Sequence, residues 1–130
     1  MKEIRWRQRF ENFKGSFSLL REAAAIEKMS EIEKAGLIQY FEVAFELAWK
    51  TLKDFEESEG FIVKSPRDAI KLAVQNEYIT EGISWLEMLS DRNSTTHLYD
   101  EKMTLEIVEK ISSTYVQRLS ELNKFLDDQA

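Results

Sequence analysis

The stretch LIQYFEVAFELAWKTLKDF, residues 37–55, predicts the central helix of an all-α protein. Its apolar side chains recur at three- and four-residue steps, which is the period of an α-helix. One face is formed by Ile38, Phe41, Phe45, Ala48, Leu52 and Phe55. Further apolar side chains widen this face, namely Leu37, Tyr40, Ala44, Leu47 and Trp49. A helix that is apolar around so much of its circumference usually lies at the centre of a fold and contacts several neighbours.

Residues at both ends of this stretch indicate where the helix begins and ends. Ser30 is a good N-cap, and Glu33 follows three residues later, as in a capping box. Gly60 can adopt the left-handed conformation that commonly ends a helix. We therefore predict a helix over residues 30–59. The apolar residues 61–63 that follow are expected to form a loop that packs against the core, because a lone strand would be marginal.

Four more helices are predicted from the same period. A first helix over residues 3–28 carries an apolar stripe formed by Trp6, Phe10, Phe13, Phe17, Leu20 and Ala24. A short third helix begins at Ser65-Pro66-Arg67-Asp68, where serine serves as the N-cap and proline fits the first helical position. A fourth begins near residues 80–81 and buries Ile83, Leu86 and Leu89.

The fifth helix is predicted over residues 103–128. Its stripe is formed by Val108, Ile111, Tyr115, Leu119, Leu122 and Leu126. The fold class that follows is all-α: a single-domain, up-and-down bundle of about five helices that spans residues 1–130.

The composition fits such a domain and excludes several classes of protein. The chain has 130 residues, of which 43% are hydrophobic, so it can bury a sizeable core. The absence of cysteine excludes disulfides and thiolate metal sites and fits a cytoplasmic protein. No apolar run approaches the roughly 20 residues that span a bilayer.

Charge is distributed unevenly along the chain. The net charge of −6 argues against a general nucleic-acid coat protein. Residues 1–21, however, hold six basic and only two acidic side chains. Two interpretations stay open: this helix offers a local surface for phosphate, or it simply has a solvated charged face.

The segment Arg92-Asn93-Ser94-Thr95-Thr96-His97-Leu98-Tyr99 contains the only histidine of the chain. Arginine binds phosphate oxygens through bidentate hydrogen bonds, and histidine moves protons near neutral pH. Arg92 and His97 on one phosphodiester would be enough to cut RNA without a metal. The plainer alternatives are a histidine that caps a helix end and a surface ion pair between Asp91 and Arg92.

The pattern Arg-x4-His-x-Tyr resembles the signature of the HEPN superfamily. Three further stretches resemble one branch of it, the nucleotidyltransferase substrate-binding protein family: residues 40–53, residues 65–68 and residues 85–93. The resemblance covers nearly the whole chain. It implies a helical bundle that forms a homodimer and is encoded beside a minimal nucleotidyltransferase. In such toxin–antitoxin pairs the HEPN member resembles an RNA-cleaving toxin, and the nucleotidyltransferase antitoxin adenylylates a tyrosine that is matched here by Tyr99.

These implications assign roles to four residues. Arg92 and His97 are the candidate catalytic pair, Asn93 supports them, and Tyr99 is the site of modification or ligand contact. If the segment were helical, Arg92 and Tyr99 would lie about 20° apart around the axis, but Arg92 and His97 would lie about 140° apart. Either Arg92 wraps around the helix, or the arginine of one chain and the histidine of its partner complete one site at or near a two-fold interface.

Three functions remain open from the sequence. The first is a metal-independent endoribonuclease toxin that acts on RNA. The second is a non-catalytic nucleotide- or substrate-binding subunit of a two-component nucleotidyltransferase. The third is a structural dimer with a decayed site. The chain is not itself the transferase, because it lacks a Gly-Ser pair followed by Asp-x-Asp. We expect no cofactor and no metal, since one histidine and no cysteine do not make a transition-metal site.

Overall fold

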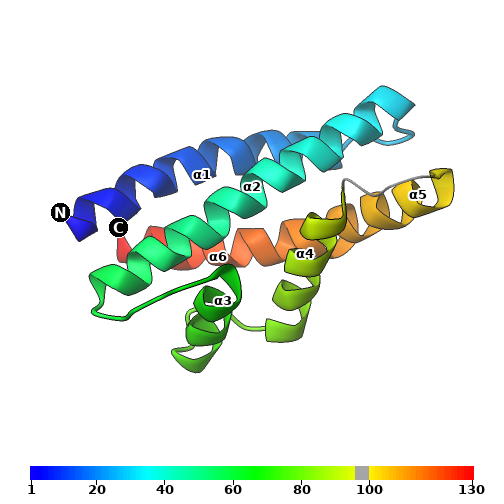
Figure 1. Cartoon of the computed structure of the whole chain (residues 1–130). Helices are drawn as coiled ribbons and strands as arrows, with labels where there is room; N and C mark the ends of the chain where they lie inside the picture. Colours follow the sequence, from blue (N-terminus) through cyan, green and yellow to red (C-terminus); the bar gives the residue numbers. More distant parts are fainter. Residues whose placement is uncertain (96–99) are drawn as a thin grey trace.

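Helices account for most of the chain in the computed structural model, which describes residues 1–95 and 100–130 (Figure 1). The elements are α1 (Lys2–Ala24), α2 (Glu31–Ser58), α3 (Pro66–Gln75), α4 (Gly82–Ser94), α5 (Glu101–Lys110), the π-helix η2 (Ile111–Tyr115) and α6 (Val116–Gln129). The described residues contain no strand. The predicted all-α class is confirmed.

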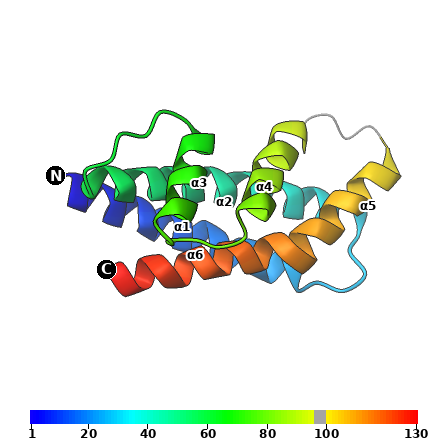
Figure 2. The same cartoon turned by 90° about the horizontal axis from the view of Figure 1, so that it is seen from below.

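The bundle is built around α2, as the sequence predicts. Helices α1 and α2 lie side by side and antiparallel, and α5, η2 and α6 follow one another as one long helical segment (Figure 1). The short helices α3 and α4 lie across the long ones (Figure 2). Helix α2 packs against α1, α3, α4, α5 and α6. Within residues 1–95 and 100–130, no helix is long and apolar enough to cross a membrane.

Local capping signals place the ends of α2 and α3. The Ser30 hydroxyl accepts a hydrogen bond from the Glu33 backbone N–H at 3.1 Å, and the Glu33 carboxylate accepts one from the Ser30 N–H at 2.8 Å. Ser65 caps α3 by accepting from the Asp68 N–H at 3.1 Å. Gly60, just past the end of α2, has a φ of +95°. These predicted boundaries are confirmed.

The Ser30→Ala variant is expected to lower the free energy of unfolding by about 1 kcal/mol, because it removes one half of the capping box. Chemical denaturation measures the loss as a shift in midpoint. Ser18→Ala, which changes an exposed serine within α1, is the control and should stay within about 0.5 kcal/mol of wild type. Equal midpoints for Ser30→Ala and wild type would contradict the stabilising role of the cap.

Other boundaries differ from the prediction. Helix α1 ends at Ala24 rather than near residue 28, because the chain turns towards Ser30 with Lys28 at a φ of +51°. Helix α5 begins at Glu101 instead of Met103, because the Asp100 carboxylate accepts a hydrogen bond from the Met103 N–H at 2.8 Å. The cap at Asp100 is therefore the signal that the apolar period alone missed.

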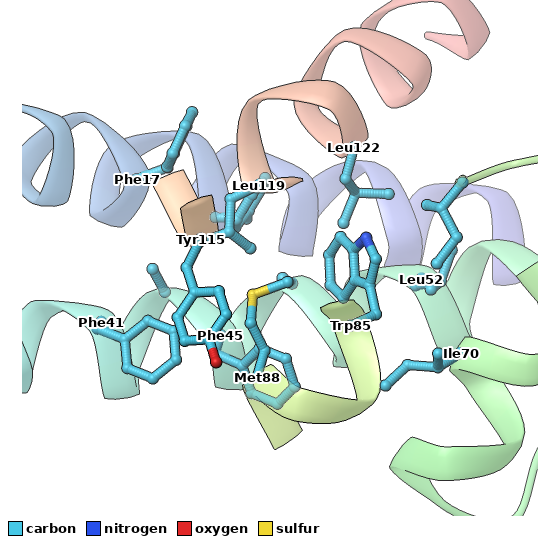
Figure 3. Packing of buried hydrophobic residues seen from close by; sticks show 14 of the residues in the cluster. Phe17, Phe41, Phe45, Leu52, Ile70, Trp85, Met88, Tyr115, Leu119 and Leu122 are labelled. Atoms are coloured by element: carbon cyan, nitrogen blue, oxygen red, sulfur yellow. The ribbon is translucent and has the colours of Figure 1, made fainter. Parts of the chain in front are cut away.

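Large aromatic side chains fill the core between α2, α4 and the last long segment (Figure 3). Phe45 of α2 packs against the fully buried Trp85 of α4, with ring centroids 6.2 Å apart. Phe41 stacks on Tyr115 of η2 at 5.5 Å. The connector after α2 is a loop, as predicted: Val63 is buried against the core, whereas Ile62 is 84% exposed. This core holds α4 beside α2 through Trp85, whereas Ile83, which the sequence predicts to be buried, is 79% exposed.

The fifth predicted helix, over residues 103–128, matches the observed segment over residues 101–129 to within two residues, but one of its predicted core residues is wrong. A π-turn, η2, separates α5 from α6, and Ile107 of α5 is buried instead of the predicted Val108, which is only partly buried. The buried positions Ile107, Ile111, Tyr115 and Leu119 are each four residues apart. In an α-helix each such step drifts by about 40°. The wider π-turn, which closes i→i+5 hydrogen bonds, absorbs that drift.

Candidate functional site

Arg92 lies in the last turn of α4 and is fixed by a side chain from the central helix. Its Nη2 donates to Oε2 of Glu46, on α2, at 2.7 Å. The two side chains are about one-third exposed, with 35% for Arg92 and 31% for Glu46. An ion pair at this depth is less screened by solvent than one at the open surface. The structure therefore holds the guanidinium at the surface in a defined orientation.

Two neighbours on α2 complete the environment of Glu46. The Trp49 indole Nε1 donates to Oε2 at 3.1 Å, and the Lys50 ammonium contacts Oε1 at 3.1 Å. Burial by itself raises the pKa of Glu46, but the hydrogen bond from Trp49, the contact with Lys50 and the charge of Arg92 outweigh it, so the pKa is lowered. Glu46 is therefore ionised at neutral pH. We call Arg92, Glu46, Trp49 and Lys50 the Arg92 cluster.

Glu46 and Lys50 are site residues that the sequence analysis missed. They are an i,i+4 pair of opposite charge inside an otherwise apolar stretch. That pattern is the signal that could have found them. It does not reveal the partner, because Arg92 lies 46 residues further along the chain.

A second link ties the end of α4 to the last long segment. Oδ2 of Asp91 accepts a hydrogen bond from the Tyr115 hydroxyl and contacts the Lys110 ammonium at 3.2 Å. Asp91 thus pairs with lysine and tyrosine from α5 and η2, and not with the adjacent Arg92. The plain Asp91–Arg92 surface pair considered from the sequence is replaced by these longer-range contacts.

Among the remaining predicted site residues, only Asn93 is described. It is exposed, and its Oδ1 lies 3.4 Å from Arg92 Nη1, at the long end of hydrogen bonding. Arg92 and Asn93 are therefore brought together at the end of α4. His97 and Tyr99 lie outside the described residues, so the convergence of Arg92 with His97 and the role of Tyr99 stay predictions. Helix α4 ends at Ser94.

Three of the six basic side chains in residues 1–21 pair with nearby carboxylates, and one of these is Arg7, which contacts Glu3 at 3.3 Å. Arg9 pairs with the buried Asp54 of α2 at 3.1 Å. Lys14 pairs with Glu11 at 2.9 Å and lies 3.8 Å from Asp127. These contacts favour the solvated-face interpretation of the N-terminal charge over a phosphate surface. Within the described ranges, no group of three or more acidic, histidine or cysteine side chains is placed to hold a metal ion.

Comparisons with known proteins agree with this architecture. The model of a family described as "Nucleotidyltransferase substrate binding protein like" matches residues 8–128. A crystal structure of a protein from Thermus thermophilus is 30% identical, with a TM-score of 0.79, over 85% of this chain and 94% of that one. No curated protein matches the chain.

Two other solved structures share the fold at lower identity. A mutant of the toxin–antitoxin MntA-HpeT has a TM-score of 0.78 at 16% identity, over 95% of this chain and 97% of that one. A toxin–antitoxin with AMP-PNP has a TM-score of 0.73 at 15% identity, over the same shares of the two chains. At these identities the likeness shows the fold alone.

Proposed function

The chain belongs to the nucleotidyltransferase substrate binding protein-like family, and from this premise we propose that it is a HEPN-type endoribonuclease. In this proposal it is the toxin of a toxin–antitoxin pair, and its antitoxin is a minimal nucleotidyltransferase. The family match gives the nucleotidyltransferase connection. Two structural neighbours are toxin–antitoxin complexes by their own descriptions, which is consistent with the pairing.

The observation that carries the proposal is the fixed Arg92. Its Nη2 is bound to Glu46, while Nη1 has only the 3.4 Å contact with the exposed Asn93 among the described residues. Glu46 of α2 thus holds the guanidinium through Nη2, and Nη1 is left to bind an incoming phosphate oxygen. Arginine that is held in this way donates to a phosphate with little loss of side-chain entropy.

The proposed reaction needs one proton acceptor and one fixed cation. His97 takes the proton from a ribose 2′-hydroxyl, and the 2′-oxygen attacks the adjacent phosphorus. The bond to the 5′-oxygen breaks, the leaving oxygen receives a proton from the imidazolium, and a 2′,3′-cyclic phosphate remains. Arg92 stabilises the negative charge on the phosphorane-like transition state. Asn93 binds the substrate or fixes the histidine tautomer.

We propose that the active unit is a homodimer with the motif at or near its interface. The roughly 140° separation expected for a helical Arg92 and His97 is unfavourable within one chain. A two-fold axis repeats the same surface on both subunits, so the arginine of one chain can meet the histidine of the other. Two equivalent sites would result.

In the same proposal Tyr99 is the regulatory residue. Transfer of AMP from ATP to its hydroxyl by the partner nucleotidyltransferase, with release of pyrophosphate, would add bulk and a negative charge close to Arg92 in sequence. That charge would compete with the RNA phosphate for the guanidinium, by the logic of phosphorylation beside a basic cluster.

Incubation of the purified chain with mixed-sequence RNA in EDTA tests the proposal. We expect cleavage that leaves 2′,3′-cyclic phosphate ends, detected by gel electrophoresis and mass spectrometry. The matching family is itself described by substrate binding, which favours a nucleotide- or substrate-binding subunit as the second candidate. Absence of cleavage on varied RNAs, together with tight binding of ATP or of a nucleotidyltransferase, would replace the first function by the second.

A further inference from the structure

We propose that Tyr115, presented by the π-turn η2, is a positioning residue for Arg92. The inference rests on the proposed ribonuclease function and concerns how its arginine is held. The Tyr115 hydroxyl donates to Asp91, and not to the Arg92 guanidinium that is proposed to bind phosphate. It acts through Asp91, the residue that precedes Arg92 in α4.

The contacts of Tyr115 anchor it from two sides. Its side chain is 1% exposed, and its ring stacks on Phe41 with an interplanar angle of 19° (Figure 3). The hydroxyl donates to Oδ2 of Asp91. A buried aromatic ring has little freedom to move, so its hydroxyl is a fixed point to which the end of α4 is tied.

The π-turn brings a second donor to the same carboxylate atom. Lys110 and Tyr115 both contact Oδ2 of Asp91, although they lie five residues apart. In an α-helix residues five apart point about 140° away from each other. A π-turn closes its hydrogen bonds from i to i+5 and places such residues on the same side. The wide turn is therefore what allows both residues to reach Asp91.

Two links from consecutive residues then restrain the last turn of α4. Asp91 and Arg92 project about 100° apart around the helix. Asp91 is tied to α5 and η2, and Arg92 is tied to Glu46 of α2. Core packing of Trp85 and Met88 already holds the earlier turns of α4, and the two polar links restrain its last turn from two different directions. The two links thereby restrict the position and orientation of Arg92 Nη1.

The protonation state of the Tyr115 phenol supports this arrangement. Burial, the hydrogen bond to Asp91 and the charge of that carboxylate all raise the pKa of Tyr115 far above its usual range. The phenol therefore remains protonated at neutral pH and keeps donating its hydrogen bond to Asp91.

The Tyr115→Phe variant tests the inference, because it keeps the stacked ring and removes only the hydroxyl. We expect kcat for RNA cleavage to fall about 10- to 100-fold with KM nearly unchanged, since a small displacement of a catalytic group costs rate more than binding. Amide hydrogen exchange in the last turn of α4 should become faster, while exchange in α1 should not change. Tyr78→Phe is the control: it removes the hydroxyl of a partly buried tyrosine that stacks on Phe125.

Variants of Asp91 and Lys110 separate positioning from plain stability. Asp91→Asn still accepts the tyrosine hydrogen bond and should keep most of kcat. Asp91→Leu should match Tyr115→Phe, and combining the two should lower kcat no further, because both remove the same link. Lys110→Met removes only a half-exposed ion pair and should behave like wild type.

The outcomes distinguish this inference from the proposed function. Normal kcat and normal amide exchange in Tyr115→Phe, with an active wild type, would overturn the positioning role and leave the ribonuclease intact. An inactive wild type whose α4 exchanges faster in Tyr115→Phe would overturn the ribonuclease and keep the structural link. A fall in kcat that is additive with Asp91→Leu would also contradict action through Asp91.

Discussion

The Arg92→Ala and His97→Ala variants are each expected to cleave RNA at least about 100-fold more slowly than wild type. General acid–base catalysis typically contributes about 10²–10⁴-fold, and fixed donors aimed at developing charge contribute similarly. Initial rates on one labelled RNA, measured in EDTA, give the ratio. Arg92→Lys should recover only part of the rate, because lysine keeps the charge but not the planar fork of donors.

The fold of Arg92→Ala should survive the substitution. Glu46 keeps its contacts with Trp49 and Lys50 when the guanidinium is removed, so no buried charge is left without a partner. Arg67→Ala, which changes an exposed arginine on α3, controls for a general loss of positive charge. If Arg67→Ala lost as much activity as Arg92→Ala, the effect would be electrostatic attraction of RNA and not catalysis. Full activity of His97→Ala would exclude the proposed proton transfer.

The Glu56→Gln variant is expected to be more stable than wild type at pH 7, with a free energy of unfolding about 3 kcal/mol higher. Glu56 is completely buried in α2, and neither carboxylate oxygen has a hydrogen-bond partner among the described residues. Burial, and to a smaller extent the charge of Glu57, raises its pKa to about 9. Glutamine has nearly the same shape and carries no charge at any pH. At pH 7 the Glu56 carboxyl ionises in the unfolded chain but stays protonated in the folded one, and this difference favours unfolding. Glutamine cannot ionise in either state, so the substitution removes that destabilising contribution.

The sign of the pH dependence follows from the same shift. Between the ordinary pKa of 4.5 and the folded value of about 9, the folded state binds more protons than the unfolded state. Wild type should therefore lose stability as pH rises through this window, and the advantage of Glu56→Gln should vanish near pH 4.5. Denaturation at several pH values measures the difference. Glu106→Gln, an exposed site on α5, should change stability by less than about 0.5 kcal/mol. A constant difference across pH would sink the explanation.

Features that depend on neighbouring residues were predictable from the sequence. The caps at Ser30 and Ser65 and the end of α2 near Gly60 arise from contacts within one turn, and the structure has them where the sequence places them. The apolar period of residues 37–55 likewise identified the central helix. Each of these signals is complete within a few residues, so no knowledge of the rest of the fold is required.

Features that depend on distant contacts were not predictable. A regular α-helix over residues 103–128 predicts that Val108 is buried, whereas in the structure Ile107 is buried and a π-turn follows. The contact of Glu46 with Arg92 joins positions far apart in the sequence, and no local pattern contains it. The motif identifies Arg92 and Asn93 as candidate site residues, but the residues that hold the arginine are seen only in the structure.

The late position of Tyr115 in the chain has a consequence for biosynthesis. Helices α1 and α2 are neighbours in sequence and can pack as soon as both have left the ribosome. Glu46 is then already present, but the hydrogen bond between Tyr115 and Asp91 cannot form until the last quarter of the protein has emerged. Because chains generally fold from the N-terminus during translation, the end of α4 is completed after most of the core. A nascent or truncated chain that lacks Tyr115 would therefore hold Arg92 through Glu46 alone. The side chain of Arg92 would be fully oriented only in a chain that includes Tyr115.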